Sequence, residues 1–405
     1  MNRFRMWTDS HRLDLLTLAA LCAIVVLLWL PFGWNISGLT DEWVFFSQVQ
    51  GGAPAVELNA LRPFSLTGLS LAYELTPDSF VGLNILFAVL LVARGFAVYL
   101  LTRELIRDAP ALASAAALLY VVYYGDTGWF WLTTFNIGWS ALWTLLAIWL
   151  LLRQLRQPSR LVWLVMAVAQ YLAMSYEGAF PLILAAPLLL PLVAGRFNRR
   201  VLVIAALWYI VPIILIVRYA VGTLAQDLAY QNAQLSIALG SESPLRDMAN
   251  SVLRVYKRLL GGAFLERYTL WRETLPTLLY AATIASVSVG TVWLGLRWHR
   301  PVLRWRQVVT TGLAGLVLIG LGFASYLVSE FRDVDYRVYY FSSVGAALLF
   351  VAALFAVAYG GKWARRTVAV GALAAILIIA PRLGKLALAV GALLNLLLPA
   401  RWLFL

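Results

Sequence analysis

A chain of 405 residues that is 62% apolar and has a mean hydropathy of +0.82 carries more apolar surface than one water-soluble core buries. The composition therefore predicts a polytopic membrane protein and excludes an ordinary soluble globular domain. The net charge of +13 does not indicate nucleic acid as a partner, because basic residues of membrane proteins gather in cytoplasmic loops.

The first expected element is a membrane-spanning helix over the apolar run 15–32, which follows a basic N-terminal segment. The run could be a signal peptide, but the sequence Pro-Phe-Gly-Trp at 31–34 is a poor cleavage site. We therefore expect a retained helix with the N-terminus in the cytoplasm. The only cysteine, Cys22, lies within this run, which excludes a disulfide within the chain.

Later apolar runs are long enough, or nearly so, to cross a bilayer, which takes about 20 residues. They cover 80–101, 109–124, 137–152, 161–174, 178–194, 201–217, 275–296, 308–328, 338–359, 368–380 and 386–399. The prediction is an all-α bundle of about twelve spans, with 1–405 as one domain. Alternating the spans puts most basic residues and both termini in the cytoplasm and most acids outside, as expected for a bacterial plasma-membrane protein.

Two segments predicted to lie outside, 34–79 and 218–274, are too long to be simple turns, and we expect them to roof an active site. The first contains the adjacent acids Asp41 and Glu42, followed by Arg62, which we predict to bind the substrate or donor. One interpretation is catalytic, with Asp41 as a base and Glu42 as a positioning or metal-binding partner. The other is local: Thr40 caps a helix whose first turn favours acids. Capping explains one acid better than two, so we favour the catalytic interpretation.

Two short outer turns each place one acid at the mouth of the bundle. Asp126 follows Tyr-Tyr-Gly, where acids and glycines are common for backbone reasons alone. Glu177 lies between two short spans, and an ionisable group near membrane depth points to function, so we predict a substrate-binding role for it. Three prolines follow Glu177 and should interrupt the next helix where it lines a cavity.

The second outer segment contains an amphipathic helix between Ser243-Pro244, a cap followed by proline, and the stop at Gly261-Gly262. We predict that this helix lies on the outer leaflet. It either roofs the bundle or binds a lipid phosphate, in which case Arg254, Lys257 and Arg258 are the ligands. The predicted polar face is Arg246, Asp247, Asn250, Ser251, Arg254, Lys257 and Arg258.

A late outer turn, 329–337, is dense in charge. Arg332 and Arg337, with Tyr336 between them, suit a phosphate group, because guanidinium forks bind phosphate with two hydrogen bonds. The alternative is that the three acids of the turn neutralise both arginines.

The layout resembles the integral-membrane glycosyltransferases of the C type, which include protein mannosyltransferases and lipid A aminoarabinose transferases. The resemblance rests on Thr40-Asp41-Glu42-Trp43 after the first span and on Arg337, Tyr339, Ser343 and Gly345 before a late span. We expect no soluble outer domain after the last span, and no Asp-x-Asp motif occurs in a segment predicted to be cytoplasmic, since Asp333-Val334-Asp335 falls in the outer turn 329–337. The lack of an outer domain departs from the family and leaves the acceptor unspecified. The lack of a cytoplasmic Asp-x-Asp motif agrees with a lipid-carried donor.

The resemblance implies transfer of a sugar, with inversion, from a polyprenyl-phosphate donor to an acceptor on the outer face. Asp41 would deprotonate the acceptor, and Arg332 and Arg337 would hold the leaving phosphate. Mg²⁺ or Mn²⁺ at Asp41 and Glu42 is an option that the resemblance leaves open. The runner-up is a lipid or solute transporter in which Arg94 and the outer acids line the path. The crowding of charge on one face favours the enzyme.

Overall fold

The structure is a computed structural model. It describes residues 2–30, 34, 36, 40–57, 62–123, 134–225, 240, 243–262, 275–299, 304–329 and 339–359. The description excludes the side chains of 2–10, 40–42, 222–225, 262, 275–278 and 357–359. The chain separates into two compact units, Met1–Ala352 and Ala353–Leu405, and the contacts that build the bundle lie within the first.

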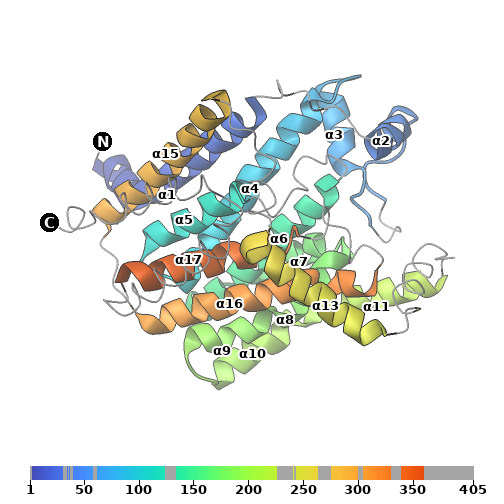
Figure 1. The fold of residues 1–405 in the computed structure, drawn as a ribbon. Coiled ribbons are helices and arrows are strands. Elements are labelled where there is room, and N and C mark those ends of the chain that lie inside the picture. Colours follow the sequence, from blue (N-terminus) through green and yellow to red (C-terminus); the bar gives the residue numbers. More distant parts are fainter. Residues whose placement is uncertain are drawn as a thin grey trace. The chain divides into compact units, whose positions relative to one another are not determined.

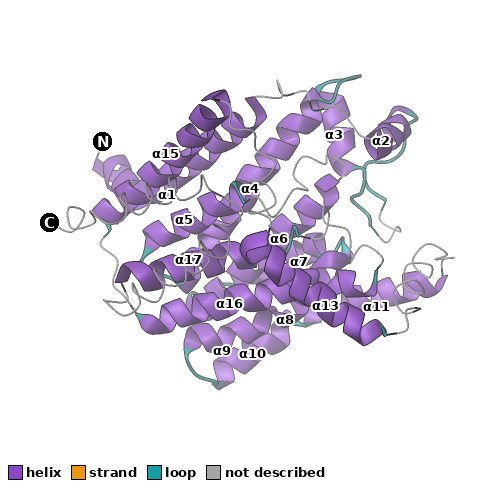
Figure 2. Ribbon diagram, in the orientation of Figure 1, coloured by secondary structure: helices purple, strands orange, loops and turns teal. Residues whose placement is uncertain are grey.

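Every regular element in the described part of the chain is a helix (Figure 2). Seven helical stretches of this part are long and apolar enough to cross a membrane. Four are α1 (Asn2–Trp29), α4 (Val81–Leu105), α6 (Phe135–Arg156) and α15 (Leu275–Trp298). The fifth joins η4 (Glu177–Ala179), α8 (Phe180–Ala185), η5 (Ala186–Leu188) and α9 (Leu189–Ala194). The others join α10 (Arg199–Trp208) to α11 (Ile210–Ala225), and α16 (Trp305–Ala324) to η7 (Ser325–Val328).

Three shorter apolar helices correspond to further predicted spans: α5 (Pro110–Val121), α7 (Arg160–Ala173) and α17 (Ser343–Tyr359). Predicted runs thus fall on helices as far as α17. The last two, 368–380 and 386–399, lie outside the described residues. The all-helical class is confirmed, with seven described stretches able to cross a membrane by length and composition, and the count of about twelve spans stays a prediction.

The helices differ in how much of their apolar surface faces protein. In the most apolar stretch of α6, 72% of the residues are buried, but in α15 only 11% are. The α15 surface exposes large side chains such as Leu279, Val289 and Trp293. Extended apolar surface of this kind is unusual in water and normal against lipid. The exposed faces therefore support an integral membrane protein in which α4 and α6 are central.

The span that begins at Glu177 is interrupted, as its prolines predict. Pro181 lies in the first turn of α8, and Pro187 lies in the 3-10 turn η5 that separates α8 from α9. Gly195 then ends α9 in the left-handed conformation with φ of 75°. The Arg306 guanidinium occupies the place of a side chain at Gly195, and its Nη2 donates to the Leu192 carbonyl at 3.2 Å.

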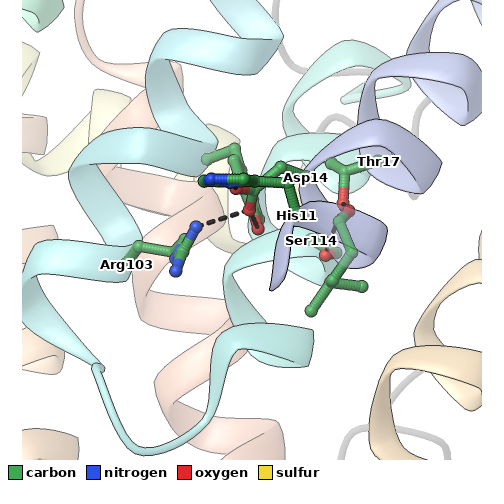
Figure 3. Close-up of polar contacts among 7 residues, drawn as sticks. His11, Asp14, Thr17, Arg103 and Ser114 are labelled. Atoms are coloured by element: carbon green, nitrogen blue, oxygen red, sulfur yellow. Dashed lines mark hydrogen bonds and ion pairs between the residues drawn. The ribbon is translucent and has the colours of Figure 1, made fainter. Parts of the chain in front are cut away.

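One end of the bundle is tied together by polar groups around Asp14 (Figure 3). The Asp14 carboxylate of α1 accepts a hydrogen bond of 2.5 Å from the Tyr99 hydroxyl and pairs with Arg103, both on α4. His11 Nδ1 lies 2.8 Å from Asp14 Oδ2. Such a satisfied cluster near a helix end is a normal way to keep charge in a membrane protein.

Neighbouring ion pairs extend this end of the bundle to α6 and α16. Glu104 at the end of α4 pairs with Arg156 at the end of α6. Arg304 Nε and Gln307 Nε2, at the start of α16, both lie 2.9 Å from Asp108 Oδ2. The segments predicted to share the cytoplasmic side therefore meet at one end. This agrees with the predicted alternation, although the membrane side itself stays a prediction.

Candidate functional site

The opposite end of the bundle, which the sequence predicts to face outward and which we call the outer end, holds the first long loop. Asn84 at the start of α4 fixes this loop to the spans. Its side-chain oxygen accepts from Trp29 Nε1 at 3.0 Å, and its amide nitrogen donates to the Ile36 carbonyl at 3.1 Å. Asn84 is fully buried, so this polar link is shielded from solvent. The sequence analysis did not single it out.

Within this loop, α2 (Thr40–Gln50) docks on the bundle through aromatic rings. The Trp43 ring meets Phe80 edge-on, with centroids 4.8 Å apart, and Phe46 packs 5.1 Å from the same ring. At the other end of the helix, Gln50 Nε2 donates to Asp78 Oδ1 at 2.8 Å. These contacts hold α2 beside α3 (Thr67–Leu75) and the turn that precedes α4 (Figure 1).

The predicted catalytic acids, Asp41 and Glu42, lie in the first turn of α2, and their side chains are outside the described ones. This position satisfies both interpretations of the pair. Acids in a first turn interact favourably with the positive end of the helix. The same turn lies at the outer end, where the catalytic interpretation requires a base.

Two other predicted site residues, Arg62 and Glu177, form a bidentate ion pair. Arg62 Nε donates to Glu177 Oε2 at 3.0 Å, and Nη2 contacts Oε1. The guanidinium carbon also lies 4.8 Å from the centre of the Tyr176 ring. The pair remains partly open to solvent, with 42% of the Arg62 side chain and 32% of the Glu177 side chain exposed.

This environment fixes the charge of Arg62. Burial would lower the pKa of the guanidinium, but the charge and hydrogen bonds of Glu177 outweigh burial and raise the pKa above its ordinary value. Arg62 is therefore a permanent cation.

Tyr176 links this ion pair to the late part of the chain. Its ring stacks on Phe341 at an interplanar angle of 10°, and its hydroxyl lies 3.4 Å from that of Tyr326. Gly178 allows the stacking, because a side-chain carbon there would lie 2.7 Å from the Phe341 ring. The first loop, the turn between α7 and η4, and the segment before α17 therefore pack against one another here. This packing was not predicted from the sequence.

The remaining predicted donor ligands divide into two groups. Arg332, Tyr336 and Arg337, like Asp126, lie outside the described residues. Their turn leaves the described chain after Ser329 and returns at Tyr339. Tyr326 and Phe341, just beyond these two points, both contact Tyr176.

The basic residues predicted to act together on the amphipathic helix do not share one face. This helix is present as α13 (Pro244–Lys257), continued by η6 (Arg258–Gly262). Arg254 and Lys257 are exposed, but the Arg258 guanidinium lies 5.7 Å from the Tyr339 ring. Ser251, assigned to the polar face, is 2% exposed, and Ser243 makes no side-chain cap. The predicted polar face is wrong at Ser251.

Arg94 is the one charged side chain found fully buried among the described residues, at 1% exposure in the middle of α4. Its guanidinium lies over two rings, 4.7 Å from the centre of Tyr340 and 5.3 Å from that of Tyr120. The Tyr340 hydroxyl contacts that of Thr134. A cation at this depth indicates either a structural anchor or part of a path.

The described side chains contain no group of three or more histidine, cysteine, aspartate or glutamate residues that could hold a metal ion. Asp41 and Glu42 are not among these side chains, so the predicted metal ligands are untested. No protein-family model matches the chain, and no curated protein matches it.

Proposed function

We propose that the protein is a membrane glycosyltransferase that moves a sugar from a polyprenyl-phosphate donor to an acceptor at the outer end of the bundle. In this proposal, Asp41 deprotonates the acceptor hydroxyl, and arginines take the charge of the leaving phosphate. The acceptor oxygen forms its bond to the anomeric carbon as the bond from that carbon to the phosphate oxygen breaks.

The observation that supports this proposal best is the Arg62–Glu177 pair. It fastens the loop that carries α2 to η4, whose first residue is Glu177, at the end of the bundle where α2 lies. The pair leaves a permanent, partly exposed guanidinium within a site that also contains carboxylates. A phosphate is the lipid-borne group that such a fork binds well.

Arg62 would bind the donor by exchanging partners. The donor phosphate is a diester that carries one negative charge, as the Glu177 carboxylate does, and it offers two oxygens to the same guanidinium fork. It gains a second negative charge as the bond to the sugar breaks, which favours phosphate over Glu177 on Arg62 during the reaction. The Tyr176 ring keeps one face of the guanidinium fixed during the exchange, because the cation–π contact does not involve the N–H groups. Glu177 thus acts as a place-holder for the donor phosphate, and Arg332 and Arg337 are its proposed companions.

The base is tested with purified protein in nanodiscs and a radiolabelled polyprenyl-phosphate sugar. Asp41→Asn should lower sugar transfer at least about 100-fold, because an amide cannot accept the proton. Glu42→Gln should lower transfer less if its role is supporting. The matched control is Glu74→Gln, an exposed acid on α3 (Thr67–Leu75) in the same loop, which should transfer normally. Normal turnover by a folded Asp41→Asn variant would remove Asp41 from the mechanism.

The second candidate, a transporter, is favoured by the burial of Arg94 within a span. The same preparation distinguishes the two functions. Release of the labelled sugar to an acceptor supports the enzyme. Counterflow of a lipid or solute across sealed vesicles, with no transfer to any acceptor, supports the transporter.

A further inference from the structure

The exposed surface of α13 divides into two stripes beside its protein-facing side. The protein-facing side is formed by Ser251, Val255 and Leu259, which recur every four residues and are buried. Val255 and Leu259 join a core cluster with residues of α16 and η7, including Phe323 and Tyr326. The outer half of the α16–η7 span is therefore the support on which α13 rests.

The first exposed stripe is apolar. Leu245 is 83% exposed and Leu253 is 67% exposed, with Leu260 and Ala249 beside them. Around the helix, at about 100° per residue, these four residues fall within one sector of about 80°. Such leucines would be a liability in water, but they suit the hydrocarbon boundary of a membrane.

Tyr256 shows which way this apolar stripe points. It lies between Leu245 and Ala249 around the helix, and its hydroxyl donates to the Leu316 carbonyl of α16 at 2.6 Å. Leu316 is 12 residues before the end of the span at Val328 (328 − 316), or about 18 Å along a helix. Because Tyr256 reaches toward the middle of the span, the leucines beside it face the hydrocarbon.

The second exposed stripe is cationic and lies next to the apolar one, on the side away from Tyr256. Arg246 and Lys257 are 11 residues apart (257 − 246), about three turns, so they share one side of the helix with Asn250. Arg254 is exposed close to them. A cationic stripe bordered by exposed leucines has the charge and depth to meet an anionic headgroup while the leucines meet its acyl chains.

We propose that α13 is a binding surface for anionic phospholipids of the surrounding leaflet, with Arg246 and Lys257 on the headgroup. The bound group is a bilayer lipid, in distinction from the sugar donor, because the stripe borders exposed leucines that meet the acyl chains of the surrounding leaflet. This surface does not depend on glycosyl transfer and would serve a transporter equally. Lipid binding would fix the tilt of α13. It would also fix the position of the chain just after α5, because the Tyr123 hydroxyl donates to the Leu259 carbonyl.

A local fluorescence measurement tests the proposal. The full chain with Cys22→Ala and Asn250→Cys carries a donor dye at position 250, in nanodiscs of phosphatidylcholine with 20 mol% phosphatidylglycerol. A small fraction of either lipid carries an acceptor dye on its acyl chain. We expect energy transfer to show phosphatidylglycerol enriched over phosphatidylcholine around α13. Each cation contributes about fivefold to headgroup binding, so Arg246→Gln with Lys257→Gln should reduce the preference about 30-fold, toward none.

The matched control is Arg199→Gln with Arg200→Gln, two exposed arginines on α10 that lose the same charge and should leave the enrichment at position 250 intact. Equal enrichment in the α13 variant and the wild type would overturn the proposal, as would a wild type without enrichment. A second set of nanodiscs also contains dye-labelled polyprenyl phosphate, and enrichment of that lipid around position 250 in place of phosphatidylglycerol would also overturn the proposal, by assigning α13 to the donor. Unchanged thermal unfolding of both variants establishes that they are folded.

Discussion

The Arg62–Glu177 pair makes a quantitative prediction about how firmly the first outer loop is held. A double-mutant cycle of Arg62→Met and Glu177→Gln measures the coupling free energy of the two side chains. Two unit charges about 4 Å apart near a protein surface attract with about 4 kcal/mol before desolvation and side-chain entropy are subtracted. Fully exposed pairs retain only about 0.2–1 kcal/mol of this.

The geometry predicts a coupling free energy for this pair that is larger than that of fully exposed ion pairs. Two nitrogens of the Arg62 guanidinium, Nε and Nη2, contact the carboxylate, and the Tyr176 ring lies against one face of the guanidinium. Exposures of 42% and 32% allow solvent to screen part of the attraction. We therefore expect a coupling free energy of about 1–2 kcal/mol. The assay is reversible unfolding of the four proteins in mixed micelles with increasing SDS.

The matched control is the pair Arg107–Glu104, which joins neighbouring turns through one contact of 3.3 Å. Its coupling should stay at or below about 0.5 kcal/mol. A coupling of Arg62 and Glu177 no larger than that of the control would mean that the loop is not fastened by this pair. The place-holder role of Glu177 would then lose its basis.

Two further stability predictions use the same unfolding assay. Gly178→Ala should destabilise the protein by about 1–3 kcal/mol, because the new methyl group meets the Phe341 and Tyr176 rings. Gly261→Ala, where no atom lies within 4 Å, is its control, and equal losses at both glycines would contradict the stacking at Tyr176. Tyr256→Phe removes one hydrogen bond to a carbonyl and should cost about 1 kcal/mol. No loss would mean that Tyr256 does not reach α16.

Most of the helical framework could be predicted, because lipid-facing helices are apolar all round and run length alone locates them. The interruption near Pro187 was also predictable, since proline removes a backbone donor. The Arg62–Glu177 pair was not, although each residue was singled out alone. Their separation of 115 residues leaves no local pattern that records the contact. Which acid meets which arginine follows from how the spans pack.

The helix α13 was predicted correctly, but its polar face was wrong at Ser251, for a different reason. A helical-wheel analysis recovers one apolar direction, but this helix has two apolar neighbours, protein on one side and, as we propose, lipid on the other. Ser251 lies on the protein-facing side together with Val255 and Leu259, where it is 2% exposed. Arg258 follows Lys257 by one residue and therefore turns about 100° from it, toward Tyr339.

Tyr176 contacts both Arg62 and Phe341, so the ion pair could do more than hold the first loop in place. If donor phosphate displaced Glu177 from Arg62, the carboxylate would lose its partner beside a ring that also stacks on Phe341. Phe341 lies two residues after Tyr339, where the chain returns from the turn that carries Arg332 and Arg337. Donor binding at Arg62 and placement of those arginines would then be linked through one aromatic stack. Gly178→Ala, which disturbs that stack without removing a charge, should for this reason weaken donor binding as well as stability.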